Sequence, residues 1–337
     1  MQTSVYNRLI KVGFAPLVGL LIAACTQNAP SGLATAVPPI ANDTAITSGA
    51  SSPVAEQSAE QVAEAVEAPT TNENTTPLAA TVNDQPIYLD MFEKQVAQFE
   101  QSLAAQGVDL STESGQAQLD QIKGQVLNAL IDQAIIEQEA AKFSIVVSDE
   151  TVEAATQESI EQGQVQFEDW LANNNLTLEE FKETLRFQLV ANQMYEQLTA
   201  NLPDVAEQVQ LRQIVVADEN TARDVIDRLK AGQDFAELAA TYSLDESNRD
   251  NGGLLGWFPR NAGLVPPEVE ALAFSINPNE VSGPVKTVLG FHIIQLENKE
   301  AERPIEAEML QALREKLFTD WLTERRAASK IERFVAS

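Results

Sequence analysis

The fold is decided by residues 279–296, which read NEVSGPVKTVLGFHIIQL. Val285 and the run from Gly290 to Leu296 predict two strands at the end of a compact domain. His292, the only histidine of the chain, lies on the second of these strands. A lone histidine on a strand is by default a half-buried structural residue, so the role of His292 depends on the sequence around it.

Upstream of this stretch, strands and helices follow one another in an order typical of an α+β domain. Leu211–Val216 predicts a strand rich in β-branched residues, and Thr221–Ala231 predicts a helix that stops at Gly232. The glycines of residues 251–258 (NGGLLGWF) mark a loop and a close-packed strand. With two further helices, at 235–242 and 269–274, the pattern predicts an antiparallel sheet with helices packed against it.

Four sequence blocks occur here in an order that is specific, although each block alone is weak. They are residues 242–247 (YSLDES), 251–258, 279–285 and 289–296. Together they resemble the parvulin (PpiC-like) family of peptidyl-prolyl cis/trans isomerases, over roughly residues 211–298. The resemblance implies an FKBP-like superfold with a small antiparallel sheet, and an isomerase activity that uses no cofactor and no metal.

Rotation about an X–Pro bond needs no nucleophile. The partial double-bond character of the amide sets a barrier of about 18–20 kcal/mol, so unaided rotation is slow. An apolar pocket for the proline ring, with polar groups around the carbonyl and the prolyl nitrogen, favours the twisted amide. By resemblance, the polar set is Asp245, Gln213, Thr287 and His292, and the pocket consists of Leu255, Trp257 or Phe258, Val265, Val269 and Phe274.

The chain departs from the parvulin pattern at two of these positions. Gln213 stands where most parvulins have histidine; it can donate and accept hydrogen bonds but cannot carry a positive charge. Val269 stands where the pocket usually has phenylalanine, which predicts a looser pocket. Trp257 and Phe258 alternate along a strand, so only one of them can face the pocket. Asp245 is an accepted alternative to cysteine in bacterial parvulins, and its plainer interpretation is a cap of its loop.

The N-terminus has the features of an export signal followed by a tether. Arg8 and Lys11 precede an apolar run, Val12–Ala24, that is shorter than the about 20 residues of a membrane span. We expect residues 1–24 to be a lipoprotein signal peptide and Cys25, the only cysteine, to be a lipidated anchor; an incidental cysteine is the alternative. Residues 25–78 are rich in Ala, Thr, Ser and Pro and carry only acidic charges, which predicts a disordered tether.

The charge of the chain excludes some partners. Of 22 basic residues, 20 are left after removal of Arg8 and Lys11, against 50 acidic ones, a net charge of −30. No basic cluster is available for a phosphate backbone, so we exclude nucleic acid as a partner. Arg249, Arg260 and Lys286 are scattered and do not form the tight basic pair of phosphate-directed parvulins. We therefore reject specificity for phosphorylated Ser/Thr-Pro sites.

Residues 79–205 predict a helical domain after a strand–turn–strand at 81–87. Ser148 predicts a helix start, and Thr177 with Glu180 predicts a capping box. The region has no catalytic constellation. Its order and composition resemble the N-terminal chaperone domain of SurA- and PrsA-like foldases, which implies a client-binding arm; the alternative is a helical spacer packed on itself.

Residues 300–337 predict one last helix. Pro304 suits its first turn, and Met309, Leu313, Leu317 and Trp321 follow at four-residue steps. The SurA-like resemblance implies that this helix packs back on the N-terminal helices, with residues 206–299 between them as the isomerase domain. The alternative is a dimerising helix and hence a homodimer.

These features predict a foldase on the extracytoplasmic side of a bacterial membrane, on the cytoplasmic membrane or on an outer membrane where one exists. It would isomerise X–Pro bonds in unfolded or newly exported polypeptides. The first alternative is a catalytically weak holdase that uses the parvulin domain to bind peptides, and Gln213 and Val269 favour it. The second alternative is a structural envelope lipoprotein without clients.

Overall fold

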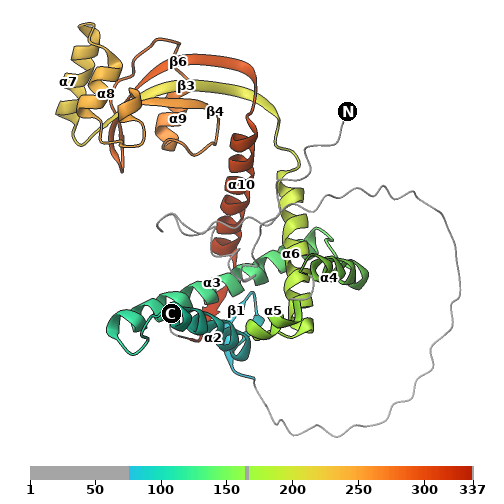
Figure 1. Ribbon diagram of the computed structural model, residues 1–337. Helices are drawn as coiled ribbons and strands as arrows, with labels where there is room; N and C mark the ends of the chain where they lie inside the picture. The colour runs from blue at the N-terminus through green and yellow to red at the C-terminus, as the bar shows by residue number, and fades with distance from the viewer. Residues whose placement is uncertain (1–75, 164–166, 336–337) are drawn as a thin grey trace, which may run out of the picture. The chain divides into compact units, whose positions relative to one another are not determined.

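The computed structural model describes residues 76–163 and 167–335, which form two compact units (Figure 1). The first unit contains the described residues up to Ile131, the segment Glu168–Leu176 and the residues from Ile331 onward; the second contains the rest. The predicted signal peptide, Cys25 and the tether up to residue 75 lie outside the described residues. Among the helices that are described, none is long and apolar enough to cross a membrane. The predicted α+β class is confirmed.

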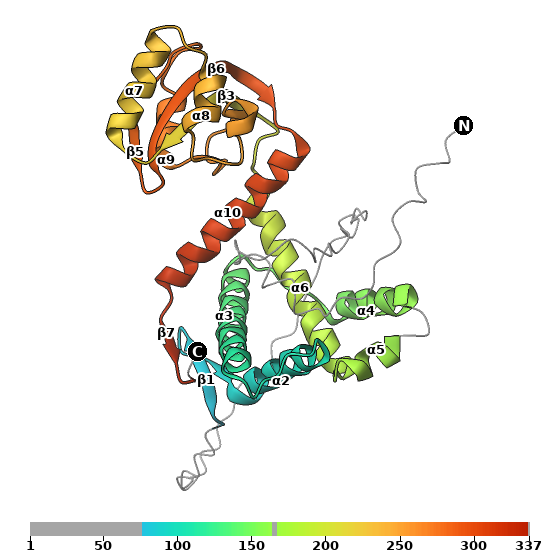
Figure 2. The same ribbon diagram turned by 60° about the vertical axis from the view of Figure 1, so that its left-hand side comes forward.

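The first unit holds a three-stranded antiparallel sheet in the order β2-β1-β7. Strands β1 (Leu78–Val82) and β2 (Gln85–Tyr88) are joined by Asn83 and Asp84, whose φ angles are +50° and +66°. Positive φ at both central residues is what a type I′ hairpin turn requires. Strand β7 (Ile331–Arg333) pairs with the other edge of β1, so the sheet joins the two ends of the described chain (Figure 2).

Helices supply the remainder of this unit and continue into the second one. Helix α3 buries Val126, Leu127 and Ile131, because these residues recur on one face of the helix. Helix α2 buries Phe92 and Val96. The bounds are Leu89–Ala105 for α2, Glu113–Lys142 for α3 and Phe167–Asn173 for α5.

The second unit contains helices α4 (Asp149–Gly163), α6 (Leu178–Thr199) and α10 (Ala307–Ala328). The capping box at the start of α6 is confirmed: Glu180 N donates to Thr177 Oγ1 at 3.2 Å, and Thr177 N donates to Glu180 Oε2 at 2.9 Å. Helix α10 lies beside α6, where the rings of Tyr195 and Phe318 are 5.7 Å apart (Figure 2).

Three details of the predicted segments are corrected by strand pairing. Leu78, expected at the end of the tether, begins β1, where it pairs with Tyr88. Pro304, expected in the first turn of the last helix, ends a long strand in which it pairs with Val205; the helix begins only at Ala307. The segment 300–337 ends not in a helix but in β7. Leu78 pairs within a local hairpin, whereas for Pro304 and β7 ladder partners distant in sequence override the local signal.

The isomerase region forms a four-stranded antiparallel sheet in the order β4-β3-β6-β5. Strands β3 and β6 are long and pair along their whole length, from Val205↔Pro304 to Val216↔Phe291. The predicted helix 235–242 is confirmed as α8. The bounds are Val205–Val216 for β3, Leu254–Pro259 for β4, Val285–Thr287 for β5, Gly290–Pro304 for β6, Glu219–Lys230 for α7, Phe235–Tyr242 for α8 and Pro267–Ala273 for α9.

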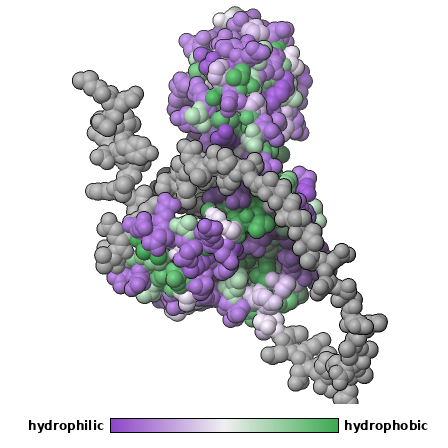
Figure 3. Space-filling view, turned by 90° about the vertical axis from the view of Figure 1, so that its right-hand side faces the viewer, coloured by the Kyte–Doolittle hydropathy of each residue, from purple (hydrophilic) through white to green (hydrophobic). Residues whose placement is uncertain are grey.

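Helices cover both faces of this sheet. Helices α7 and α8 pack against one face, over Ile214, Val216 and Ile293 (Figure 1). Helix α9 packs against the other face, over Leu211 and Ile294. Because side chains alternate along a strand, residues 211, 213 and 215 of β3 share the α9 face with residues 292 and 294 of β6. Outside these cores the surface is mainly hydrophilic, with separate hydrophobic patches, in the view of Figure 3.

Candidate active site

The register of three strands brings the polar set together on the α9 face of the isomerase sheet. His292 of β6 pairs with Val215 of β3 on one side and with Val285 of β5 on the other. Gln213 and Thr287 lie two residues from these partners and therefore on the same face as His292. Gln213 Oε1 lies 3.4 Å from His292 Nδ1, and Thr287 Oγ1 lies 2.9 Å from His292 Nε2.

Asp245 completes the set from the loop that follows α8. Its Oδ2 accepts a hydrogen bond of 2.6 Å from Gln213 Nε2, and its Oδ1 accepts two from Ser247, of 3.1 Å from N and 2.6 Å from Oγ. Asp245 therefore caps its own loop and also contacts Gln213. The four residues Thr287, His292, Gln213 and Asp245 form one continuous chain of contacts, which we call the relay.

The relay has one orientation that satisfies all its members. The ionised Asp245 carboxylate can only accept hydrogen bonds, so the NH₂ group of Gln213 faces it and Oε1 faces His292. Nδ1 of His292 then carries the proton and donates to Gln213 Oε1. Nε2 is left as the acceptor for the Thr287 hydroxyl. The carboxylate thus fixes the tautomer of an imidazole that it does not touch.

Both titratable members of the relay have shifted pKa values. Burial lowers the pKa of His292, whose residue is 1% exposed, although the charges of Asp245 and Glu268 act in the opposite direction. Burial would raise the pKa of Asp245, but the hydrogen bonds from Ser247, Asn248 and Gln213 outweigh it, and the pKa lies below its usual value. At neutral pH the relay therefore combines a neutral imidazole with a carboxylate.

Two buried polar residues that hold the relay were missed in the sequence. Ser243 Oγ accepts hydrogen bonds from Val215 N and Asp245 N, at 3.2 and 3.3 Å, which ties the loop to β3. The Asn248 amide donates to Asp245 Oδ2 from the far end of the loop. Ser243 belongs to the block 242–247 that supports the family resemblance, so the only available signal was its place there; Asn248 lies just beyond that block.

The apolar residues predicted for the pocket separate into two groups. Phe258, Val265, Val269 and Phe274 belong to one buried cluster, and Leu255 is a partly exposed member at its edge. Phe258 and Val269 are fully buried and form its interior. Trp257 lies outside this cluster, where the guanidinium of Arg303 stacks 4.2 Å from its ring centroid. Phe258 pairs with Val209, a member of the same cluster, and lies on the cluster side of β4, whereas Trp257 does not; a register shift between Trp257 and Leu254 lets Leu255 share that side.

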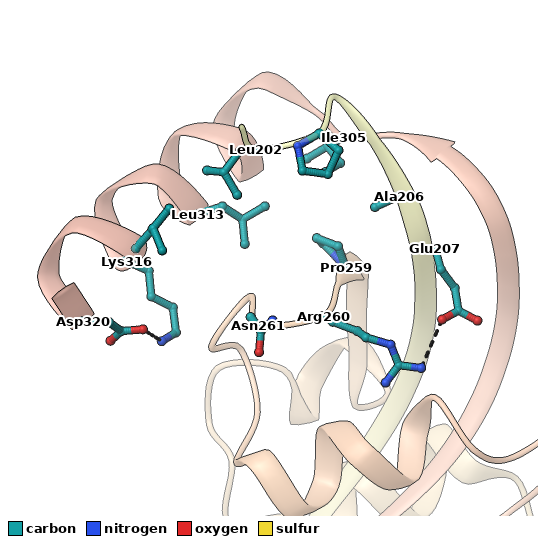
Figure 4. A pocket seen from close by; sticks show the side chains of 12 residues that line it. Leu202, Ala206, Glu207, Pro259, Arg260, Asn261, Ile305, Leu313, Lys316 and Asp320 are labelled. Carbon is teal, nitrogen blue, oxygen red and sulfur yellow. Dashed lines mark hydrogen bonds and ion pairs between the residues drawn. The ribbon is translucent and has the colours of Figure 1, made fainter. Parts of the chain in front are cut away.

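A concave feature of about 420 Å³ lies where α10 meets the start of β3 and the end of β4 (Figure 4). Its walls are mainly apolar, with Leu202, Pro259 and Leu313 among them. Its charged side chains are paired with one another, Arg260 with Glu207 at 3.1 Å and Lys316 with Asp320 at 2.5 Å. None of the relay residues lines this hollow. Within residues 76–163 and 167–335, no group of three or more His, Cys, Asp or Glu could hold a metal ion.

Comparisons with known proteins match both parts of the chain. A family model described as a PPIC-type PPIase domain (Rotamase) matches residues 190–298, and one described as a SurA-like N-terminal domain matches residues 62–195. The foldase protein PrsA of Caldanaerobacter subterraneus subsp. tengcongensis is 34% identical over 283 residues, which cover 76% of this chain and 87% of that protein.

Two further relatives carry similar descriptions. Foldase protein PrsA 2 of Bacillus cereus is 35% identical over 176 residues, which cover 51% of this chain and 60% of that protein. The crystal structure of a peptidylprolyl isomerase (PrsA) from Bacillus anthracis matches with a TM-score of 0.45 and 27% identity, covering 60% of this chain and 94% of that one. The predicted resemblance to parvulin-type isomerases and PrsA/SurA-like foldases is confirmed by the family models and the first relative.

Proposed function

The chain belongs to the PrsA foldase family, and we propose that the relay and the apolar cluster beside it are the site of its isomerase activity. The protein is a peptidyl-prolyl cis/trans isomerase and chaperone whose substrates are polypeptides. The assignment of roles to Thr287, His292, Gln213 and Asp245 is our proposal.

The proposed mechanism lowers the cost of twisting the X–Pro amide. The apolar cluster, with the partly buried Leu255 at its edge, would take the proline ring out of water. The twisted amide loses its conjugation, so its carbonyl oxygen and prolyl nitrogen change their demand for hydrogen bonds. The Thr287 hydroxyl and the His292 imidazole lie beside this position and are preorganised by the relay. No bond is made or broken and no proton has to be transferred.

The observation that carries this proposal is the position of Gln213. Its amide bridges Asp245 and His292, with one contact of 2.6 Å and one of 3.4 Å. Gln213 was, with Val269, one of the two reasons to favour a catalytically weak holdase, because it stands where most parvulins have histidine. A residue that donates on one side and accepts on the other keeps the relay continuous without a second imidazole. The continuity supports catalysis over the holdase alternative.

A protease-coupled assay with an Ala-Leu-Pro-Phe peptide tests the site. Gln213→Leu keeps the side-chain size but breaks both contacts, and we expect kcat/KM to fall at least about tenfold, as expected when a preorganised hydrogen-bonding group is lost. Gln210→Leu is the matched control, since Gln210 lies on the same strand and bonds only to Asn298 at the surface. It should change kcat/KM less than about twofold.

Two outcomes would contradict this assignment. Full activity of Gln213→Leu and His292→Ala would show that the catalytic site lies elsewhere. No acceleration by the wild-type chain, together with suppression of aggregation of an unfolded client, would favour the holdase alternative. Circular dichroism of each variant checks that a loss of rate is not a loss of fold.

We also propose that the protein acts outside the cytoplasm and is held at a membrane through lipidated Cys25. Membership of the foldase family and the sequence of residues 1–25 support this location. Cys25→Ser should move the protein from the membrane fraction to the soluble fraction, and mass spectrometry of the purified N-terminus should find acyl chains only in the parent chain. An unchanged membrane fraction for Cys25→Ser would contradict the anchor.

We propose that residues 79–205 bind unfolded segments of clients, as the match of residues 62–195 to a SurA-like N-terminal domain supports.

We also propose that the last helix is not a dimerisation element. On α10, Phe318 already packs against Tyr195 of α6, and Gln311 donates to the Tyr195 hydroxyl at 3.4 Å. These intrachain contacts support a monomer over the homodimer alternative. Sedimentation equilibrium tests this directly, and a dimer that dissociates on Phe318→Ala would overturn it.

A further inference from the structure

Three charged side chains meet beside the apolar cluster, outside the relay. Glu207 of β3 pairs through Oε2 with Arg260 Nη2 at 3.1 Å and through Oε1 with Lys299 Nζ at 3.2 Å. Figure 4 shows the first of these pairs. Burial would raise the pKa of Glu207, but the two cations outweigh it and the pKa lies below its usual value, so the carboxylate is ionised at neutral pH. We call Glu207, Arg260 and Lys299 the clasp.

Both cations of the clasp make a second contact, and in each case the partner is Phe274. The guanidinium of Arg260 lies 4.1 Å from the centroid of the Phe274 ring, and Lys299 Nζ donates a 2.6 Å hydrogen bond to Phe274 O. Phe274 is the residue at which α9 ends, where a helix leaves carbonyl groups that a cation can satisfy. The clasp therefore holds Phe274 by its ring and by its backbone.

Phe274 is one of the two aromatic residues of the apolar cluster that we propose for the proline ring. Its ring meets that of Phe258 edge to face, with centroids 6.3 Å apart and an interplanar angle of 79°. Phe258 is fixed by the β3–β4 ladder, whereas Phe274 stands between the end of a short helix and a loop. Val269, where the family usually has phenylalanine, supplies no third aromatic ring. The width of the pocket therefore depends on where Phe274 is held.

The convergence of these contacts distinguishes the clasp from an ordinary surface ion pair. The side chains of Glu207, Arg260 and Lys299 are 35%, 52% and 29% exposed, and an isolated pair at such a site contributes little to stability. The three residues come from β3, from the residue after β4 and from β6, and they meet at one residue of the pocket. A displacement of Phe274 would therefore break contacts with two cations at once.

We propose that Glu207 is a positioning residue of the isomerase site. By holding Arg260 over the ring of Phe274 and Lys299 at its carbonyl, it sets the width of the pocket and makes the pocket selective for the five-membered ring of proline. The inference rests on the proposed pocket in the apolar cluster and adds what determines its size. Glu207 itself touches neither the cluster nor the substrate and acts only through the two cations.

The test compares two peptides, Ala-Leu-Pro-Phe and the same peptide with pipecolic acid, whose ring has one more methylene, in place of proline. NMR exchange spectroscopy gives the catalysed cis/trans exchange rate of each with the full chain. The wild-type chain should prefer proline at least about tenfold, the size of one methylene in a fitted pocket. Glu207→Gln should lower this preference about threefold, the size of one partly exposed ion pair. Glu300→Gln is the matched control, since Glu300 pairs with Arg303 and not with the clasp, and it should leave the preference unchanged.

A second variant keeps the proposal testable if Glu207→Gln folds poorly. Arg260→Met keeps the aliphatic stem but removes the charge over the Phe274 ring, and it should lower the preference for proline by at least about threefold. Glu207→Gln added to Arg260→Met should then have a smaller effect than in the parent chain, because the two act through one contact. An unchanged preference in both single variants would overturn the proposal, as would a wild-type chain that accelerates both peptides equally. A wild-type chain that accelerates neither peptide would refute the proposed isomerase site itself, which is a distinct outcome.

Discussion

The two antiparallel sheets of this protein differ in how much of each is visible in the sequence. The isomerase sheet, β4-β3-β6-β5, is built from strands that all lie between Val205 and Pro304. The sheet β2-β1-β7 joins residues 78–88 to Ile331–Arg333. The first sheet carries motif blocks at fixed spacing, whereas β7 is three residues long and has no pattern of its own. The isomerase sheet was predictable because its strands lie close together in the sequence. Strand β7 was not predicted, because it is short and lies far in the sequence from its partner β1.

The two sheets also differ in what they bury. The isomerase sheet buries His292 and Gln213 among apolar residues, and both have hydrogen-bonding partners. In the other sheet Ala79, Ala80 and Val82 are fully buried. A buried polar relay tolerates little displacement, because each lost contact leaves a costly unsatisfied group. The isomerase sheet should therefore respond more steeply to small backbone changes, and one substitution beside each sheet tests this contrast.

The largest effect is expected at Gly253, which precedes β4. Its φ is +73°, and an added Cβ would overlap the backbone oxygen of Gln213. Gln213 N also donates a 2.8 Å hydrogen bond to Gly253 O, so the two backbones cannot move apart freely. Gly253→Ala should lower the free energy of unfolding by at least about 2 kcal/mol and kcat/KM by more than about tenfold. Gly256→Ala is the control, because no atom lies within 4 Å of its added Cβ. Denaturant titration and the isomerase assay measure both variants. Equal losses of stability and of kcat/KM for Gly253→Ala and Gly256→Ala would contradict this expectation.

An intermediate effect is expected at the end of β7. Phe334 N donates to Ala79 O at 2.9 Å, and Phe334→Pro removes this donor from the three-stranded sheet. We expect a loss of about 1 kcal/mol in the local opening free energy of β1, measured by hydrogen exchange, with no change in isomerase activity. Phe334→Ala, which keeps the N–H, is the control. Faster exchange in β3 or β6 would mean that the two sheets are not independent.

A similar or smaller effect is expected for the helix cap of α6. Thr177→Ala removes the Oγ1 that accepts from Glu180 N, keeps the backbone N–H that donates to Glu180 Oε2, and should cost about 1 kcal/mol. Thr184→Ala is the control, since the Thr184 hydroxyl only bonds back to Glu180 O within the helix, and it should be near neutral. Thermal unfolding of both variants gives the comparison, and a larger loss for Thr184→Ala would contradict the cap.

The smallest effect is a pH dependence of the isomerase sheet. The folded pKa of His292 is lowered, so below about pH 6.5 the unfolded chain binds a proton that the folded chain resists. The free energy of unfolding should therefore fall as the pH drops below about 6.5 and level off once the pH is below the folded pKa. The contribution of Asp245, whose pKa is also lowered, is lost only below about pH 3.9.

The variant His292→Gln isolates the contribution of the imidazole to the pH dependence of stability, because the chain has no other histidine. The difference in stability between the parent chain and the variant should change as the pH falls below about 6.5, and should be constant above about pH 7.5. A difference that does not vary with pH would mean that the imidazole is not buried as a neutral group.

Local chemistry was predictable wherever its determinants lie close together in the chain. The capping box of Thr177 and Glu180 needs only four residues, and the α8 helix needs one apolar face and an N-cap at Asp234. The relay residues could be named from family blocks. Which of Trp257 and Phe258 faces the pocket could not, because alternation permits either until the β3–β4 register is known.

The sequence by itself determined the α+β class, the order of the isomerase blocks and the chemical types at the site, because these depend on residue identity and short-range periodicity. Only the tertiary structure decided how Gln213 substitutes for a histidine, since its two contacts reach Asp245 and His292, 32 and 79 residues away. The same holds for β7 and for the long β3–β6 ladder that displaced Pro304 from a helix. Such pairings depend on which distant segments meet, and no local propensity encodes them.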